Sequence, residues 1–119
     1  MEDQPMFPLE SVLFPGQTLP LRIFEERYKK LVIDSLARSG VFGIVLIEKG
    51  REVGGGDVRS SIGCSAEIID HQEFKDGTLA LTVAGRHRIV IEQWLDDAPY
   101  PIATIRSWPD ELQEITQSR

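Results

Sequence analysis

The residues of this chain best suited to nucleophilic or metal chemistry are one cysteine and two histidines. Cys64 and His71 are seven residues apart, and a histidine close to a cysteine can activate it as a thiolate. Cys64, however, falls on the apolar face of an alternating segment, which favours a buried structural thiol. His87 lies between Arg86 and Arg88, which favours a surface histidine. Spacings this wide do not form a zinc site, so we expect neither a metal ion nor a catalytic thiol.

Carboxylate pairs and a glycine run are the other candidates for chemistry. Adjacent acidic residues point in different directions and cannot converge on one substrate atom. The pairs are Glu25-Glu26, Asp96-Asp97 and Asp110-Glu111. The glycine run 54–56 is not followed by a helical pattern, and no Gly-Lys pair occurs in the sequence, so a phosphate-binding loop is not expected. We therefore expect a binding module without catalytic residues or a cofactor, rather than an enzyme.

Length and charge restrict the class of protein further. With 119 residues, of which 41% are apolar, the chain suits one domain with a single core. Its formal net charge is -6, and it has no evident basic-aromatic cluster, so we expect no nucleic-acid partner. The single cysteine suits a reducing compartment, which predicts the cytoplasm. The sequence has no signal peptide and no apolar run of about 18 residues, so we expect no membrane association.

One amphipathic helix is expected early in the chain, over about 24–39. Its apolar stripe consists of Phe24, Tyr28, Leu31, Val32 and Leu36. This spacing places the five side chains on one face of a helix. We expect Phe24 and Tyr28 to anchor that face on the rest of the fold. Gly40 follows as a left-handed cap.

Short strands account for most of the remaining chain. Segment 18–23 is expected to be a strand, and Pro20 within it predicts an edge position. Segment 41–47 is an apolar run typical of a strand covered on both faces, and 62–69 alternates between apolar and other residues. Further strands and turns are indicated at 6–9, 15–16, 75–77, 79–91 and 100–105. Short strands with one inserted helix predict a mainly β (α+β) fold, a small closed or half-closed barrel.

The last residues differ from this pattern. Pro109 precedes an acidic first turn, and Leu112 and Ile115 have helical spacing. A helix that stops about two turns after it begins is marginal in water on its own. We therefore expect a β-rich domain over 1–108 and, over 109–119, the start of a truncated or frayed helix.

Four sequence segments, together with their order along the chain, indicate a protein family. The most specific is Pro20-Leu21-Arg22-Ile23-Phe24-Glu25-Glu26-Arg27-Tyr28. The others are Phe7-Pro8-Leu9 with Leu13-Phe14-Pro15-Gly16, then Ile62-Gly63-Cys64-Ser65-Ala66-Glu67-Ile68, then Asp76-Gly77-Thr78-Leu79 to Gly85-Arg86-His87-Arg88. Together they resemble the N-terminal, substrate-binding domain of Lon-type proteases from Phe7 to Ile105. Cys64 stands where that family often has threonine, which matters little at a buried strand position.

The resemblance implies a PUA-like pseudo-barrel of about six strands with one helix, in agreement with the elements above. It implies recognition of unfolded or tagged polypeptides for ATP-dependent proteolysis, and a role in self-association as a homo-oligomer. The ATPase and Ser-Lys peptidase of such proteases have no counterpart in this sequence. The source is therefore either a Lon-type protease or a stand-alone Lon-domain protein. Because PUA-like barrels often bind RNA, an RNA-binding module is the alternative.

Peptide recognition of this kind requires exposed apolar side chains or a free strand edge. The best apolar candidates in the sequence are Leu13, Phe14 and Trp94. Arg86 and Arg88 are expected on one strand face, where they can meet an acidic partner, although the residues alone favour surface ion pairs. These five residues form the predicted peptide-binding set.

Overall fold

The computed structural model describes residues 2–48 and 58–108. Its elements are β1 (Glu2–Leu9), β2 (Thr18–Ile23), α1 (Glu26–Leu36), β3 (Val41–Glu48), β4 (Val58–Glu73), β5 (Leu79–Trp94) and β6 (Ile102–Ser107). Two features expected from the sequence, the glycine run 54–56 and the helix start over 109–119, lie outside the described residues. No helix in the described part is long and apolar enough to cross a membrane.

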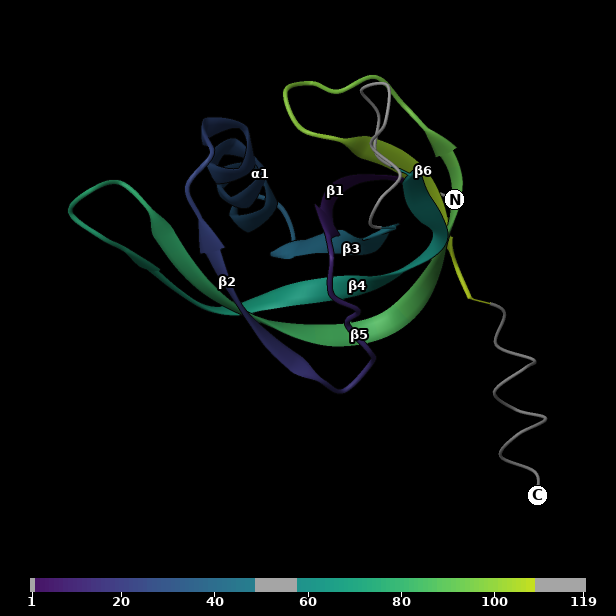
Figure 1. Cartoon of the computed structure of the whole chain (residues 1–119), viewed down its shortest axis with the longest axis horizontal. Helices are drawn as coiled ribbons and strands as arrows, with labels where there is room; N and C mark the ends of the chain where they lie inside the picture. Colours follow the sequence, from purple (N-terminus) through teal and green to yellow (C-terminus); the bar gives the residue numbers. More distant parts are fainter. Residues whose placement is uncertain (1, 49–57, 109–119) are drawn as a thin grey trace.

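Five of the six strands close into a barrel (Figure 1). β5 pairs with β4, β4 with β3, β3 with β1 and β1 with β6, and β6 then pairs back onto β5. All these pairs are antiparallel except β1 and β3, which run parallel. Closure leaves no free edge within this ring, which a chain of this size could not otherwise cover. The expected mainly β barrel with one helix is confirmed.

β2 lies outside the ring, at one end of the strand order. It pairs with the first half of β5, from Leu79 to Ala84, whereas the second half of β5, from Ile89, pairs with β6. The long strand β5 therefore belongs both to the barrel and to a three-stranded extension with β4 and β2. Pro20 cannot donate a hydrogen bond to a neighbouring strand, and the edge position predicted from it is confirmed.

The helix is shorter than the sequence predicts, because Glu25 still has extended backbone angles (φ -82°, ψ 138°). Phe24 therefore precedes the helix and does not share its buried face; its side chain is 66% exposed, so the predicted anchoring role is wrong. Tyr28 is buried as expected, together with Leu31 and Val32. Gly40 has a φ of +76° and its N–H donates to the carbonyl of Ser35 at 2.6 Å, which confirms the left-handed cap.

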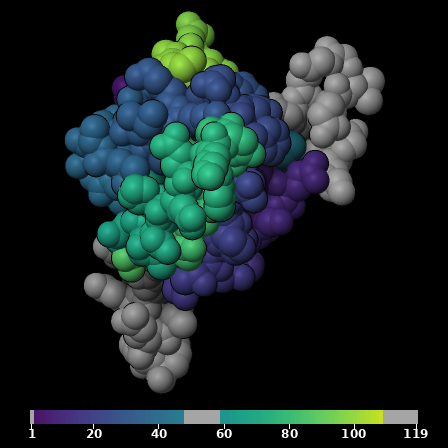
Figure 2. Space-filling view, turned by 90° about the vertical axis from the view of Figure 1, so that its left-hand side faces the viewer, coloured from purple at the N-terminus to yellow at the C-terminus, as the bar shows by residue number. Residues whose placement is uncertain are grey.

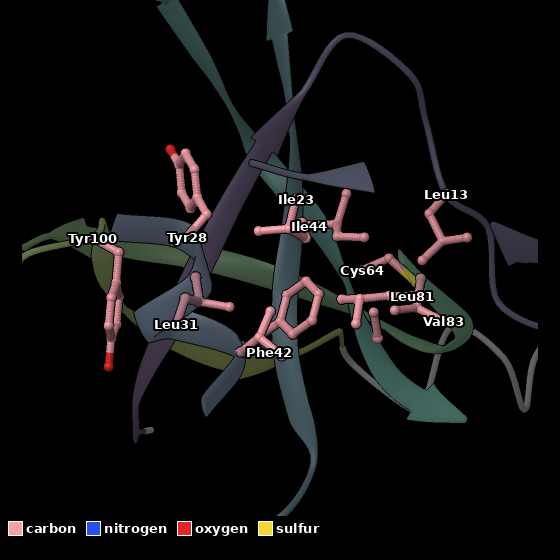
Figure 3. Packing of buried hydrophobic residues seen from close by; sticks show 12 residues of the cluster. Leu13, Ile23, Tyr28, Leu31, Phe42, Ile44, Cys64, Leu81, Val83 and Tyr100 are labelled. Atoms are coloured by element: carbon pink, nitrogen blue, oxygen red, sulfur yellow. The ribbon is translucent and has the colours of Figure 1, made fainter. Parts of the chain in front are cut away.

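Two hydrophobic clusters fill the molecule. The larger one joins α1 to the sheet (Figure 3) and consists of Leu13, Ile23, Tyr28, Leu31, Val32, Phe42, Ile44, Cys64, Ala66, Leu81, Val83 and Tyr100. The smaller one consists of Met6, Val45, Ile89, Ile91, Ala103 and Ile105. β3 contributes to both, because Phe42 and Ile44 belong to the larger cluster and Val45 to the smaller. The prediction that segment 41–47 is covered on both faces is therefore confirmed.

Candidate functional site

The residues suited to nucleophilic or metal chemistry do not form a reactive site. Cys64 is 2% exposed, and burial raises the pKa of its thiol, which makes the nucleophilic thiolate less accessible at neutral pH. The ring Nδ1 of His87 lies 3.2 Å from the hydroxyl oxygen of Ser65, and His71 is exposed on β4. Among residues 2–48 and 58–108, no three His, Cys, Asp or Glu side chains gather in a way that would hold a metal ion.

A close backbone contact fixes the loop between β1 and β2. The N–H of Gly16 donates to the carbonyl of Gly85 at 2.9 Å, and the N–H of Gly85 donates to the carbonyl of Gln17 at 2.8 Å. A Cβ atom at position 85 would lie 2.3 Å from the carbonyl oxygen of Phe14. The glycine in the family-like hairpin is therefore required because it lets this loop lie directly on β5.

The loop forms one wall of a small groove, which we call the loop groove. The groove has a volume of about 120 Å³ and is lined by Ser11, Val12, Leu13, Phe14, Ile44, Leu46, Ile62, Gly63, Cys64 and Arg88. Three of the five predicted peptide-binding residues thus meet here: Leu13, Phe14 and Arg88. Phe14 is 52% exposed, and its apolar neighbours Val12 and Ile62 are also exposed. Exposed apolar side chains that gather around one groove can mark an interaction site.

Leu13 does not have the exposed position expected from the sequence. Its side chain is 5% exposed and belongs to the larger hydrophobic cluster, where it lies near Cys64 and Val83 (Figure 3). The adjacent Phe14 is 52% exposed, so the loop directs these two side chains to different sides. Leu13 therefore supports the loop groove from below and does not offer a free surface.

The other two predicted residues do not line the loop groove. Trp94 is partly buried against the smaller hydrophobic cluster, and the guanidinium of Arg59 lies over its ring, 4.4 Å from the ring centre. Arg86 forms an ion pair with Glu67 on the neighbouring strand β4. The structure therefore separates Arg86 from Arg88, although the sequence places them on one strand face.

Sequence reasoning missed a second and larger groove, which we call the arginine groove. It has a volume of about 340 Å³ and is lined by Phe7, Pro8, Leu9, Arg22, Ile23, Phe24, Glu25, Arg27, Tyr28, Ile47 and Arg59. Six of these residues come from the segment 22–28, which includes most of the family-like signature. The signal available in the sequence was therefore this signature. In the structure, Phe24 within it is 66% exposed and does not serve packing.

The arginine groove has an aromatic floor and a charged rim. The rings of Phe7 and Tyr28 are stacked, with their centres 4.5 Å apart and an interplanar angle of 8°. Arg22 donates a hydrogen bond of 3.3 Å to the hydroxyl of Thr78. Thr78 belongs to the β4–β5 turn, which projects toward the viewer in Figure 2. The guanidinium of Arg27 lies 4.7 Å from the centre of the Tyr28 ring. The inference from sequence that basic and aromatic residues do not cluster is therefore wrong.

Carboxylates hold part of this rim in place. Arg27 donates to Glu25 at 3.1 Å and lies 3.9 Å from a carboxylate oxygen of Asp97. Burial works against the charge of Arg27, but the hydrogen bond to Glu25 and the nearby negative charges outweigh it and raise the pKa of this guanidinium. Asp97 belongs to the connection between β5 and β6, so these contacts join the start of α1 to that connection.

A closed β-barrel that carries an apolar groove and a groove lined by aromatic and arginine side chains is typical of a binding domain. The model of the ATP-dependent protease La (LON) substrate-binding domain matches residues 3–118 of this chain. The chain belongs to this family. Membership supports a role in substrate recognition in Lon proteases.

Individual relatives agree with this assignment. The chain is 28% identical over 117 residues to the Lon protease of Flavobacterium johnsoniae and 29% identical over 114 residues to that of Porphyromonas gingivalis. These alignments cover 96% and 93% of this chain, but the chain spans only 14% and 13% of the length of these relatives. The chain therefore corresponds to a small part of the Lon proteases that it matches.

Solved structures show the same fold. The crystal structure of a Lon N-terminal domain protein from Xanthomonas campestris has a TM-score of 0.77 and 33% identity; the match covers 92% of this chain and 62% of that one. The N-terminal domain of a Mycobacterium avium complex Lon protease has a TM-score of 0.70 over 98% of this chain and 63% of that one. Its identity is 18%, so it supports the fold alone.

Proposed function

We propose that this domain recognises unfolded or tagged polypeptides and that the loop groove binds their apolar side chains. The observation that carries the proposal is the cluster of exposed apolar residues Val12, Phe14 and Ile62 around a loop held in one conformation. A rigid aromatic side chain loses little conformational entropy on binding and buries a large area. Arg88 lines the same groove, and we assign to it the binding of an acidic residue of the polypeptide.

Addition of a peptide strand to the edge of β2 is the other physical route to peptide binding. It is the weaker route, because Pro20 stands in the middle of this edge strand and has no N–H to donate. We place recognition on side-chain contacts in the loop groove instead. As in the family, we assign the domain to the cytoplasm and to self-association within a larger assembly.

Binding to an array of unstructured apolar peptides, followed by fluorescence anisotropy on the best of them, tests the proposal. We expect Phe14→Asp to weaken binding about tenfold, because a carboxylate replaces the exposed ring in an apolar contact. Ile33→Asp is the matched control, since Ile33 is 60% exposed on α1 and lines neither groove. Absence of peptide binding by the parent chain, or an equal loss in the Ile33 variant, contradicts the proposal.

A further inference from the structure

We propose that segment 109–119 of this chain covers the loop groove with its apolar residues and so competes there with polypeptide ligands. This inference rests on the proposed function, because it assigns a competitor within the chain to the same groove. The segment lies outside the described residues, but the structure shows where it begins. The family model matches through residue 118, so the segment is part of the matched domain.

The described part of the chain ends beside the loop groove. The N–H of Trp108 donates to the carbonyl of Arg88 at 3.0 Å, and the guanidinium of Arg88 lies 5.9 Å from the centre of the Trp108 ring. Arg88 lines the loop groove. Leu112 follows Trp108 by four residues, which span about 6 Å in a helix and at most about 14 Å in extended chain. Leu112 can therefore reach the groove without any change in the barrel.

The apolar pattern of the segment matches the size and surface of the loop groove. A volume of about 120 Å³ has room for one aliphatic side chain and is smaller than most small-molecule sites. Phe14 and Ile62 are exposed at this groove. Leu112 and Ile115 have the spacing of one helix face. Since an isolated helix of this length is marginal in water, burial of these two side chains on a neighbouring apolar surface would stabilise the segment.

The charges of the groove and the segment are complementary. Among the described residues that line the loop groove, Arg88 alone is charged, and it has no carboxylate partner within 2–48 and 58–108. The segment contains three carboxylates, those of Asp110, Glu111 and Glu114, against a single cation. Glu111 precedes Ile115 by four residues and so borders the same helix face. An exposed ion pair contributes little, so the apolar contacts supply most of the affinity and the charges favour this acidic occupant.

A paramagnetic label in the full chain tests whether the segment covers the groove. A nitroxide on Gln113→Cys lies next to Leu112 in sequence, whereas the native Cys64 is 2% exposed and remains unlabelled. We expect the methyl resonance of Ile62 to broaden. The resonance of Ile69, seven residues or about 23 Å further along β4, should keep its intensity. Equal broadening of the two resonances, or none at Ile62, overturns the inference.

A mixture of two samples tests whether a second copy is the occupant instead. One sample carries the nitroxide without isotope labels, and the other carries isotope-labelled methyl groups without the nitroxide. We expect the Ile62 resonance to keep its intensity in this mixture, because the segment covers the groove of its own chain. Broadening of Ile62 in the mixture overturns the inference in favour of contact between copies.

Peptide anisotropy measures the competition. Replacement of both Leu112 and Ile115 by serine removes the apolar face of the segment, so an apolar peptide should bind about threefold more tightly, as expected when the segment occupies the groove about two thirds of the time. The matched control replaces both Gln113 and Gln117 by serine, which changes the same segment away from that face and should leave the affinity unchanged. Equal affinity of the two double variants for the peptide overturns the inference.

The two measurements separate this inference from the proposed function. If apolar peptides bind the parent and both double variants equally and the Ile62 resonance does not broaden, the proposed function stands and the inference fails. If the Ile62 resonance broadens in the labelled chain but apolar peptides bind none of these chains, the proposed function fails. The loop groove is then a contact surface for segment 109–119 alone.

Discussion

The loop groove and the arginine groove are held together by different forces. The loop groove depends on packing and backbone contact: Leu13 is buried beneath it, and Gly85 lets the loop lie directly on β5. The arginine groove depends on charge and polar contacts, with Arg27 held by Glu25 and Asp97. Backbone and core contacts are insensitive to salt and pH, whereas partly exposed ion pairs are weakened by both. The two grooves should therefore respond to different perturbations.

The largest effect that separates the grooves is expected from Leu13→Ala. Removing this buried side chain leaves a cavity under the loop, so the free energy of unfolding should fall by about 2–4 kcal/mol. Phe14 loses its fixed position at the same time, so binding of apolar peptides should weaken. Urea denaturation and peptide anisotropy measure both changes.

Leu36→Ala is the control for this change. It removes the same atoms from a side chain that is 41% exposed on α1, so the unfolding free energy should change little. The arginine groove should be unchanged in the Leu13 variant below its unfolding temperature, as the methyl resonance of Ile47, which lines it, would report. If this resonance shifts together with the loss of apolar-peptide binding, the two grooves are not held independently, and the comparison drawn above is wrong.

The sequence predicted most of the fold because the fold follows from local patterns. Proline at the edge of β2, the apolar run of β3 and the glycine cap after α1 each depend on a few adjacent residues. The arginine groove was not predictable in this way. Phe7, Arg22 and Arg59 are far apart in sequence, and only closure of the barrel and the crossing of β2 bring them together.

Leu13 and Phe24 show, at single positions, that the sequence pattern did not predict which side chains are buried. The sequence indicated that Leu13 was exposed and that Phe24 was buried, and the structure reverses both. Leu13 belongs to a loop without periodicity, so its orientation is set by contact with β5 through Gly85. Phe24 has helical spacing relative to Tyr28, but the backbone becomes helical only after Glu25. A periodic pattern does not show where an element begins.

A smaller effect, confined to the side of the arginine groove, is expected from Tyr100→Phe. The Tyr100 hydroxyl donates to Asp34 of α1 at 2.6 Å and so joins the helix to the β5–β6 connection that carries Asp97. This hydrogen bond is the first cause of the lowered Asp34 pKa, while burial raises the pKa of Tyr100 to about 12. Loss of the hydroxyl should lower the melting temperature by less than Leu13→Ala does, and should leave the binding of apolar peptides at the loop groove unchanged.

The difference in melting temperature between the parent chain and Tyr100→Phe should depend on pH with a definite sign. Because the folded state lowers the Asp34 pKa, its contribution is present above the ordinary value of 3.8 and is lost as the pH falls through the lower, folded pKa. Because the folded state raises the Tyr100 pKa from 10.0, its contribution is complete below that value and is lost as the pH rises toward about 12. The melting-temperature difference between parent and variant should therefore be constant near neutral pH and decrease at both extremes. A difference that is independent of pH contradicts the assignment.

The smallest effect distinguishes the two arginines that the sequence could not separate. Arg88 lines the loop groove, with its guanidinium 5.9 Å from the centre of the Trp108 ring, whereas Arg86 pairs with Glu67 on the exposed surface. Both Arg88→Gln and Arg86→Gln should change the unfolding free energy by less than about 1 kcal/mol, since each guanidinium interacts near solvent. Only the Arg88 variant should weaken an apolar peptide that carries one glutamate, by about twofold, with no change for the same peptide carrying glutamine. An equal loss in both variants would mean that the arginines act through the general field of the surface, and the loop groove would then be defined by its apolar residues alone.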